Sequence, residues 1–511
     1  MPAYGAQNRP GAFAQSFEMF ASIVAELEGV GSDAWTHGTL EDHLGRRSRE
    51  LMRRLYQDHL DLRAANEQHH DDIIGADRVA RTRTERGHQR VLSTVFGDVT
   101  VTRNAYRAPK AVNLYPADDV LNLPHGKHSD GLAKLAVTES VRGSFDTAIE
   151  AITRATGVVL GKPQILDLVA QAAVDVPGFY AARRPSASPD TDVLVMTNDG
   201  KGIRMRPDGL RETTRKAAAS SSNKLATRLS PGEKSGRKRM AELGAVYDIT
   251  PVPRVAADII ASPTTTTTVT STPRPDNRKR QTRGKWLTAS ITDDIPTVIA
   301  TTFDEATRRD PDHRRVWIAL VDGNNQQIQA ITAEATRRGK TVTIVIDFIH
   351  VLEYLWTAAW SFFDKGDPDV EAWVATQATT ILKGRSNDVA AGIRRRATRF
   401  GYSTTERKGA DDAATYLTNK KPYLNYATAL ESGWPIATGI IEGACRHLVK
   451  DRFDITGARW GLDGAHTILT LRALTINGDL EEYWAYHLLK EHYRRHETRY
   501  THQQNDYILA G

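Results

Sequence analysis

The order of the apolar segments between residues 192 and 363 most constrains how this chain can fold. Three segments that predict strands come first, namely DVLVM, GIRMR and MAELGAVYDI. A helix, the strand VWIALV, a helix, the strand TVTIVI and a further helix follow them. DVLVM is apolar on both faces, as expected for a central strand covered by helices. A meander followed by alternating helices and strands predicts a mixed α/β sheet with helices on both faces.

This element order is that of a ribonuclease-H-like core, and the chain of 511 residues is long enough for further domains around it. Only helical patterns occur between the last predicted strand and the final acidic helix. We therefore predict five segments. They are an N-terminal helical region (1–88), a β-hairpin and helix-turn-helix region (89–185), the first part of the core (186–365), a helical insertion (366–435), and a segment with the acidic core helix and C-terminal helices (436–511).

A long amphipathic helix is predicted near the N-terminus, at residues 39–67. Four leucines are spaced seven, four and seven residues apart on it, which places them on one face. Such a face indicates packing within one subunit, which we expect, or a coiled-coil contact in a dimer, which is the alternative. The leucines are Leu44, Leu51, Leu55 and Leu62.

A β-hairpin and a pair of short helices come next. Residues 90–106 alternate apolar and polar side chains about a Gly-Asp pair that begins at Gly97, and this predicts a hairpin. Ser144 is a candidate N-cap and Gly157 a candidate C-cap of a first short helix, and Pro163 begins a second. The pair predicts a helix-turn-helix, which either reads DNA or is only structural.

Acidic residues follow three predicted strands. Asp199 lies in MTNDGKG, Asp322 in ALVDGNN, and Asp347 in VIDFIH, where His350 comes three residues later. One further carboxylate, Glu442, lies on a late helix that is otherwise basic and apolar. Three carboxylates brought together from strands and a helix are what a two-metal phosphoryl-transfer site requires. Mg²⁺ prefers such oxygen ligands.

The helix that bears Glu442 has two distinct faces. Glu442, Arg446 and Lys450 are four residues apart from one another on one face, so an exposed Glu442–Arg446 ion pair is the alternative to a catalytic role. A second face is apolar and predicts burial. Its residues are Ile441, Cys445, Leu448 and Val449.

The aspartates have structural alternatives as well. Asp-Gly is a frequent turn signal, so either Asp199 or Asp322 alone could be a turn residue. Asp322, however, precedes a predicted helix, where a hairpin is excluded. Its strand is the fourth, which lies next to the first in a ribonuclease-H-like core, so we favour Asp322 over Asp347 as the second catalytic carboxylate. Asp347 would instead cap the following helix, and His350 would form a hydrogen bond there or, less favourably, bind zinc.

Positive charge is concentrated in one region. The net charge is +6, yet residues 201–240 contain twelve Lys or Arg against three Asp or Glu, which gives 12 − 3 = +9. A second cluster, RKRQTRGK, occupies 278–285 beside a Thr-rich run. Both indicate either solvated loops or arms that contact DNA phosphates. The candidate DNA-binding residues are Lys201, Arg204, Arg237, Lys238, Arg239, Arg278, Lys279, Arg280, Arg446 and Lys450.

The remaining composition excludes several protein classes. A single cysteine, Cys445, excludes internal disulfides and Cys-rich zinc sites. No apolar run has the length of a membrane span, and the first residues have no signal-peptide pattern. We therefore expect a soluble cytoplasmic protein without a membrane partner, associated with the nucleoid when it is bound to DNA.

Several stretches resemble the ISKra group of bacterial insertion-sequence transposases, distant relatives of Mutator-like elements. They include TVFGDVTVTR, EKSGRKRMAELGAVYDITPVPR, IDFIHVLEYLW and IIEGACRHLVKDRFDITGARW. The resemblance implies a DDE transposase with Asp199, Asp322 and Glu442 as the catalytic, metal-binding triad, and with Asp347 and His350 at an auxiliary motif. Where relatives carry cysteine pairs after the hairpin, this chain has AYRAPKAVNLYPADD, so no zinc is expected there.

The implied activity is two-metal phosphoryl transfer with two Mg²⁺ ions, for which Mn²⁺ may substitute. The enzyme would bind terminal inverted repeats in double-stranded DNA through its N-terminal region, hydrolyse a strand at each element end and join the 3′-hydroxyl to target DNA. We expect a homodimer or larger assembly on DNA. The alternatives are a catalytically inactive, transposase-derived DNA-binding protein and a ribonuclease-H-like nuclease.

Overall fold

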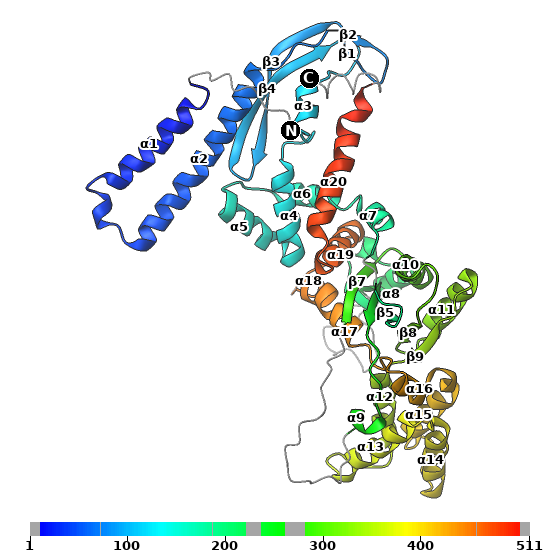
Figure 1. Cartoon of the computed structure of the whole chain (residues 1–511). Coiled ribbons are helices and arrows are strands. Elements are labelled where there is room, and N and C mark those ends of the chain that lie inside the picture. The colour runs from blue at the N-terminus through cyan, green and yellow to red at the C-terminus, as the bar shows by residue number, and fades with distance from the viewer. Residues whose placement is uncertain are drawn as a thin grey trace. The chain divides into compact units, whose positions relative to one another are not determined.

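The chain divides into two compact units (Figure 1). Residues 1–181 and 480–511 form one, here called the N-terminal unit, and residues 182–479 form the other, the sheet unit. The predicted final segment, 436–511, is thus divided between the two. The computed structural model describes residues 11–71, 73–185, 188–220, 237–260, 282–455 and 457–500.

Two helices, α1 (Ala14–Glu28) and α2 (His37–Ala65), lie side by side at the start of the N-terminal unit (Figure 1). The buried carboxylate of Asp58 on α2 accepts hydrogen bonds from Ser16 Oγ at 2.6 Å and from the Ser16 backbone N–H at 3.1 Å. Leu60 is buried in a cluster with the hairpin that follows, whereas Leu44 is exposed. The helix thus packs on α1 and on the hairpin, but none of the four predicted leucines is fully buried, and a contact in a dimer stays a prediction.

The predicted β-hairpin is confirmed and is longer than expected. Strands β3 (Arg83–Thr94) and β4 (Gly97–Arg107) pair antiparallel, and Gly97 has φ +116°, a conformation that favours glycine. The side chain of Gln57 on α2 accepts a hydrogen bond from the Thr100 backbone N–H at 2.7 Å. This contact fixes α2 along the hairpin.

The two short helices also form where the sequence predicts them. They are α5 (Phe145–Thr156) and α6 (Lys162–Gln171). Ser144 Oγ accepts from the Thr147 N–H at 3.1 Å as the N-cap, and Gly157 ends α5 with φ +76°. The other elements of this unit are β1 (Ile73–Ile74), β2 (Ala80–Arg81), α3 (Pro116–Val120), α4 (Asp130–Arg142), α7 (Val176–Ala182) and α20 (Leu480–Arg495).

One run of the chain, Lys162–Ala182, is long and apolar enough to cross a membrane by length and composition, and it is the only such run among the described residues. It is not one uninterrupted helix, because α6 ends at Gln171 and α7 begins at Val176. A membrane-spanning segment must satisfy its backbone hydrogen bonds continuously. Core helices of soluble proteins pass the same test.

Buried histidines connect α20 to the rest of the N-terminal unit and predict a pH dependence of stability. Burial, together with the charges of His492 and His125, lowers the pKa of His496 to about 3. An unfolded histidine has a pKa of about 6.5, so the unfolded state binds more protons as the pH falls below that value. The free energy of unfolding should therefore decrease from about pH 7 to about pH 5.

Urea denaturation of the wild type and of His496→Gln checks this expectation. Gln can still donate to the Leu123 carbonyl, which lies 3.1 Å from His496 Nε2. The variant should lose less stability on acidification than the wild type. An equal loss in both proteins would show that His496 does not carry the effect.

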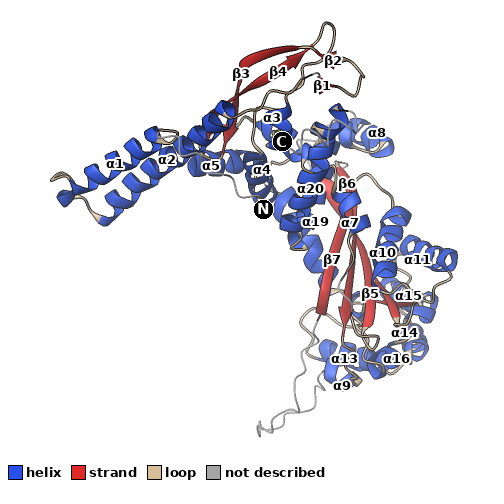
Figure 2. Cartoon of the chain, turned by 45° about the horizontal axis from the view of Figure 1, so that its top comes forward, coloured by secondary structure: helices blue, strands red, loops and turns tan. Residues whose placement is uncertain are grey.

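The sheet unit contains a five-stranded mixed sheet in the order β7-β6-β5-β8-β9 (Figure 2). The first three strands of this sheet, β5, β6 and β7, pair antiparallel as a meander. Strands β8 and β9 are parallel to β5. The fourth strand thus lies next to the first, as expected. The strands are β5 (Val193–Arg204), β6 (Lys238–Ile249), β7 (Thr282–Ser290), β8 (Trp317–Val321) and β9 (Thr343–Ile346).

Two strand assignments from the sequence were wrong. DVLVM and GIRMR are not separate strands, because β5 runs through Asp199-Gly200 and pairs with β6 along its whole length. The third strand of the meander is β7, which the sequence analysis assigned to a basic segment. Continuous pairing with a neighbour keeps the backbone extended where local Asp-Gly chemistry favours a turn.

Helices cover both faces of the sheet. Helix α10 (Ile295–Arg309) packs on β5 and β6, and α19 (Leu462–Ile476) packs on β7. The helix α17 (Gly439–Ala444) and the π-helical turn η4 (Cys445–Lys450) also lie against β5, and α17 against β6. The remaining helices are α8 (Glu212–Ser220), α9 (Ala256–Ile259), α11 (Asn325–Arg338), α12 (Phe348–Ala359) and α18 (Asp451–Phe453).

Close packing of α10 on β6 leaves no room for a side chain at Gly244. A Cβ at this position would lie 2.4 Å from Thr302 Cγ2 on α10. Gly244→Ala should therefore destabilise the protein by about 1–3 kcal/mol through overpacking. Gly392→Ala is the matched control, because its Cβ meets nothing within 4 Å and it should stabilise a helix by about 1 kcal/mol. Chemical denaturation measures the free energy of unfolding of both variants. Equal changes in the two would disprove the packing argument.

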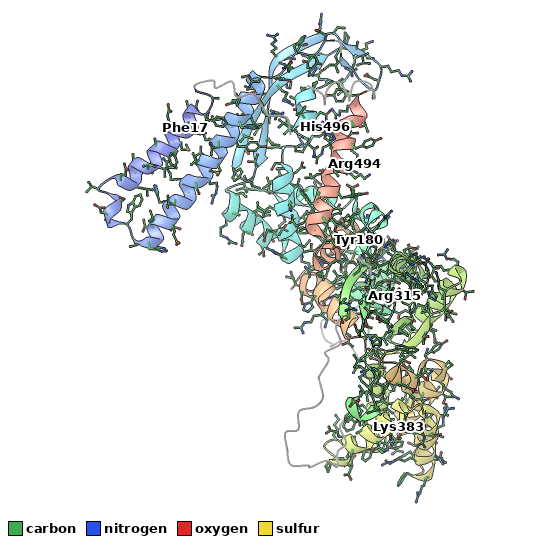
Figure 3. The ribbon with its side chains drawn as sticks, viewed as in Figure 1. Phe17, Tyr180, Arg315, Lys383, Arg494 and His496 are labelled. Carbon is green, nitrogen blue, oxygen red and sulfur yellow. The ribbon has the colours of Figure 1, made fainter. Side chains whose placement is uncertain are left out.

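A buried ion pair joins β6 to the segment before β8. Arg315, labelled in Figure 3, donates from Nη1 to Asp248 Oδ1 at 2.7 Å, and both side chains are almost fully buried. Removing one partner of such a pair would leave a buried charge uncompensated. The pair therefore fixes the start of the strand that leads to Asp322.

The region 366–435 consists of helices and turns, as predicted. Tyr426 from this region is fully buried and donates to the Ile346 carbonyl at 2.8 Å. The insertion is therefore attached to the last strand of the sheet. Its helices are α13 (Asp369–Leu382), α14 (Ser386–Arg399), α15 (Lys408–Asn419) and α16 (Tyr426–Glu431).

Candidate active site

Asp199 lies within β5, and Asp322 and Asp347 directly follow the ends of the neighbouring strands β8 and β9. The parallel registers pair Thr197 with Leu320 and Val321 with Ile346. If the first register is continued by two residues, Asp199 corresponds to Asp322. If the second is continued by one residue, Asp322 corresponds to Asp347. Adjacent strands lie about 4.8 Å apart, so Asp199 and Asp322 project from neighbouring positions. Side chains alternate between faces, and level residues of paired strands point to the same face.

Asp347 has a structural environment. It is 0% exposed, and it caps α12 by accepting the Ile349 N–H at 2.7 Å. Its second carboxylate oxygen accepts the Thr438 backbone N–H at 2.9 Å and also the Thr438 hydroxyl. Asp347 thereby joins the end of β9 to the segment that begins α17. The expected helix cap is confirmed.

Asp322 is less enclosed than Asp347. Its Oδ1 accepts the Asn324 N–H at 2.7 Å, which shapes the turn into α11. The Tyr416 hydroxyl from the helical insertion donates to the Asp322 carbonyl oxygen at 3.3 Å. Lys420, directly after the end of α15, donates to Asn325. Burial lowers the pKa of this lysine, and the charge of Asp322 opposes that shift. The insertion thus supplies a buried cation beside Asp322.

Glu442 lies exposed on α17 in the helix that covers β5 and β6. The apolar face predicted for this helix is confirmed, since Ile441, Cys445, Leu448 and Val449 are buried. One turn after Glu442, the Cys445 thiol donates to Asp199 Oδ2 at 3.0 Å. This contact brings the Glu442 helix directly onto the strand that bears Asp199.

The pKa of the Cys445 thiol is consistent with its position close to Asp199 and Glu442. Burial first, and then the charges of Asp199 and Glu442, raise the pKa of the Cys445 thiol well above its usual range. The thiol therefore stays protonated and donates to Asp199 instead of reacting as a thiolate. Glu242 lies opposite Gly200 in the β5–β6 register, on the other face of the sheet. Burial and the charge of Asp199 raise its pKa.

The π-helical turn η4 alters the helix directly after Glu442. Such turns add a residue to a helical turn and occur frequently at functional sites. Arg472 on α19 donates from Nε to the Leu448 carbonyl at 2.8 Å and also bonds the His447 carbonyl. The guanidinium therefore holds carbonyls within the turn in place.

The predicted DNA-binding residues differ in exposure. Arg239 is half-buried and donates to the Ile291 carbonyl at 2.8 Å and to the Gly209 carbonyl at 3.3 Å, which does not favour a role as a phosphate-contacting arm. Arg278, Lys279 and Arg280 lie outside the described residues. Lys201 is partly exposed, and its charge acts on the Cys445 thiol. The exposed candidates are Arg204, Arg237, Lys238, Arg446 and Lys450.

His350 lies on the first turn of α12 and is partly exposed. Its Nδ1 is 3.1 Å from Glu353 Oε2. This is the local hydrogen bond that the sequence analysis favoured over zinc binding. Within the described parts of the chain, His350 belongs to no group of three potential metal ligands.

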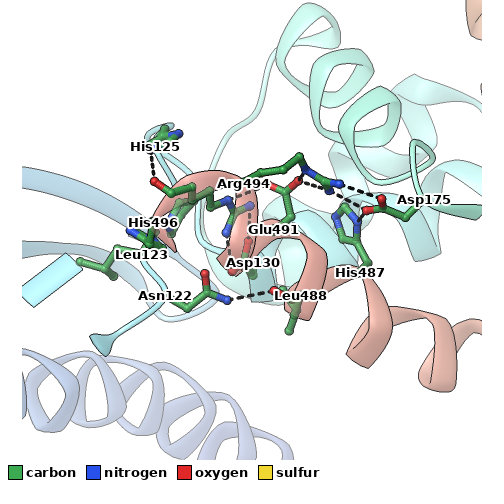
Figure 4. A network of polar contacts seen from close by, with 12 residues as sticks. Asn122, Leu123, His125, Asp130, Asp175, His487, Leu488, Glu491, Arg494 and His496 are labelled. Carbon is green, nitrogen blue, oxygen red and sulfur yellow. Dashed lines mark hydrogen bonds and ion pairs between the residues drawn. The ribbon is translucent and has the colours of Figure 1, made fainter. Parts of the chain in front are cut away.

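One group of three side chains in the described residues could hold a metal ion, and it lies in the N-terminal unit. Ligand atoms of Asp175, His487 and Glu491 all lie within 4.8 Å of one another. Figure 4 shows that Arg494 also bonds both carboxylates, at 2.6 Å and 2.8 Å to Asp175. A guanidinium that already neutralises them competes with a cation. The sequence analysis did not find this group, because Asp175 lies 312 residues before His487 in the chain.

Asp199, Asp322 and Glu442 do not form such a group, so their carboxylate oxygens are not all within 4.8 Å of one another. Asp199 and Asp322 lie on or directly after adjacent strands, and the Cys445 contact attaches the Glu442 helix to Asp199. All three ligands would be oxygens, which suits Mg²⁺. Sequence reasoning missed Cys445, Thr438, Tyr416 and Lys420 as neighbours of the aspartates, because each contact joins distant parts of the chain.

The comparison with known families decides no identity. No protein-family model matches the chain, and no curated protein gives a significant match. The resemblance to insertion-sequence transposases therefore remains an expectation from the motifs themselves.

Proposed function

We propose that the chain is a DDE-type DNA transposase with a ribonuclease-H-like core, which cleaves element ends and joins them to target DNA. The observation that carries the proposal is that Asp199 lies on β5 and Asp322 directly follows the adjacent parallel strand β8, with the Glu442 helix attached to Asp199. The sheet order, with the fourth strand beside the first, supports the same proposal.

In this proposal Asp199, Asp322 and Glu442 hold two Mg²⁺ ions, and Mn²⁺ can substitute. Ions bound there would activate the attacking oxygen and stabilise the leaving oxygen of the phosphodiester. Hydrogen bonds hold two of these ligands in place, because the Cys445 thiol donates to Asp199 and the Asn324 N–H donates to Asp322. Hydrolysis at each element end leaves a 3′-hydroxyl, which then attacks target DNA.

Cleavage of end-containing DNA in Mg²⁺ and in Ca²⁺ tests the proposal. We expect strand cleavage in Mg²⁺ and DNA binding without cleavage in Ca²⁺. Binding without cleavage in Mg²⁺ and in Mn²⁺ would favour a catalytically inactive, transposase-derived DNA-binding protein. Cleavage that does not depend on the end sequence would favour a ribonuclease-H-like nuclease. Inverted repeats and a short target duplication flanking the gene would support a transposase.

A further inference from the structure

The N-terminal unit contains a basic groove between α2, the hairpin turn and the turn from α5 to α6. Its volume is about 490 Å³. Helix α2 supplies three arginines on one face, at positions separated by three and four residues. Lys127 and residues of the two turns add to its lining, which contains four Lys or Arg residues against two acidic residues, Glu50 and Asp98. The residues used below are Arg46, Arg49, Arg53, Lys127, Gly97 and Gly157.

Two turns fix the arginines within this groove. A Cβ on Gly157 would lie 3.6 Å from Arg49 Nη1, and a Cβ on Gly97 would lie 3.1 Å from Arg53 Cδ. Arg49 also reaches the Arg154 carbonyl at 3.5 Å. The guanidinium groups therefore lie along the backbones of the hairpin turn and the α5–α6 turn. The groove is a defined part of the unit and is not a set of unrelated surface arginines.

Part of the charge in the groove remains available. Arg53 is paired with Glu50. Arg46 and Lys127 are both exposed, and neither makes a side-chain hydrogen bond or ion pair within the described residues. Seven residues of α-helix separate Arg46 from Arg53, a rise of about 10.5 Å. The charge of B-DNA repeats every 3.4 Å or so per strand along the duplex axis, so a row of this length can contact more than one phosphate.

The second helix of the pair cannot supply this charge. Lys162 is the only cationic residue of α6, and it forms an ion pair with Asp146 at 2.7 Å. The exposed surface of α6 also carries an acidic residue, Asp167. A helix that approaches DNA needs phosphate contacts nearby to set its position. Those contacts must therefore come from a neighbouring element, and α2 is the basic one beside it.

We propose that this groove binds the phosphate backbone of duplex DNA and thereby positions the α5–α6 turn, where Val159 is 73% exposed, on the duplex. The choice of DNA as the occupant rests on the proposed function. A row of arginines in an open groove matches a repeating anionic charge and does not match a single small anion. The sequence analysis expected DNA binding by the N-terminal region and its helix-turn-helix, but the DNA-binding residues that it named lie at 201–240 and 278–285 and on the Glu442 helix.

The test is the affinity of the full-length protein for a fluorescent duplex, measured by anisotropy in Ca²⁺ over a series of salt concentrations. The triple variant Arg46→Gln, Arg49→Gln and Lys127→Gln should bind at least about 10-fold more weakly, and its slope of log K against log salt should be shallower by about 2.7. The control carries Arg83→Gln, Arg86→Gln and Lys110→Gln, which remove three exposed charges from the same unit away from the groove. The control should retain its affinity.

Equal affinities of the two triple variants would overturn the proposal. If the groove variant melts at a lower temperature, the double variant Arg46→Gln and Lys127→Gln keeps the test valid, because both side chains are exposed. Unchanged DNA affinity with an altered oligomeric state would assign the groove to a contact between copies and would also overturn it. Since binding is measured without cleavage, a failure of the catalytic proposal would leave this result interpretable.

Discussion

Asp322→Ala should abolish strand cleavage and strand joining in Mg²⁺ while the protein remains folded, whereas Asp347→Ala should lower thermal stability and leave measurable cleavage. Asp322 is partly exposed and accepts one internal hydrogen bond, so its loss costs little packing. Asp347 is fully buried and accepts three hydrogen bonds, from Ile349 and twice from Thr438. Losing them should destabilise the protein by about 3 kcal/mol.

Thermal denaturation by circular dichroism and a gel assay of DNA cleavage measure the two effects separately. Asp412→Ala is a suitable control, because it removes an exposed carboxylate from α15. It should change neither stability nor cleavage. If Asp347→Ala is well folded and inactive while Asp322→Ala still cuts DNA, the second catalytic carboxylate is Asp347.

Glu442→Gln should leave folding and DNA binding intact and reduce cleavage by at least about 100-fold, because loss of a metal ligand costs more than loss of a residue that only orients one. The amide has the same shape as the carboxylate, and Glu442 is exposed, so the packing of α17 does not change. Gln is a poor ligand for Mg²⁺. The cleavage rate and the DNA affinity are the two measurements.

Asp451→Asn provides the comparison for this variant. Asp451 is exposed a short distance further along the same helical segment, where it lies 2.9 Å from His447 Nδ1. This control should cleave DNA at the wild-type rate. Wild-type cleavage by Glu442→Gln would remove Glu442 from the site and leave it as an exposed residue of α17.

Periodicity and strand order gave the general features of the sheet unit. The apolar face of the Glu442 helix, the helix after Asp322 and the cap at Asp347 all depend on contacts close in sequence. The meander was misassigned because Asp-Gly signals a turn locally, while the pairing of β5 with β6 overrides that preference. β7 was missed because charged residues surround its short apolar part.

The surroundings of the candidate carboxylates could not be predicted in the same way. The Cys445 thiol and Asp199 are 246 residues apart, and their contact depends on how α17 packs on the sheet. Tyr416 reaches the Asp322 carbonyl from the helical insertion, 94 residues away. Local patterns contain no signal for such pairs. The same holds for α20, which the sequence analysis assigned to the C-terminal segment and which belongs to the N-terminal unit.

The π-helical turn after Glu442 makes the angular position of this side chain independent of the buried face that follows it. Each residue of a regular helix turns the chain by about 100°, so one extra residue rotates Glu442 by that angle relative to Leu448 and Val449. Deleting one residue within Cys445–Lys450 would restore a regular helix and rotate Ile441 by about 100° relative to Leu448 and Val449, so these side chains could not all stay buried. We expect the same deletion to disturb the contact of Cys445 with Asp199, because the thiol lies within the turn.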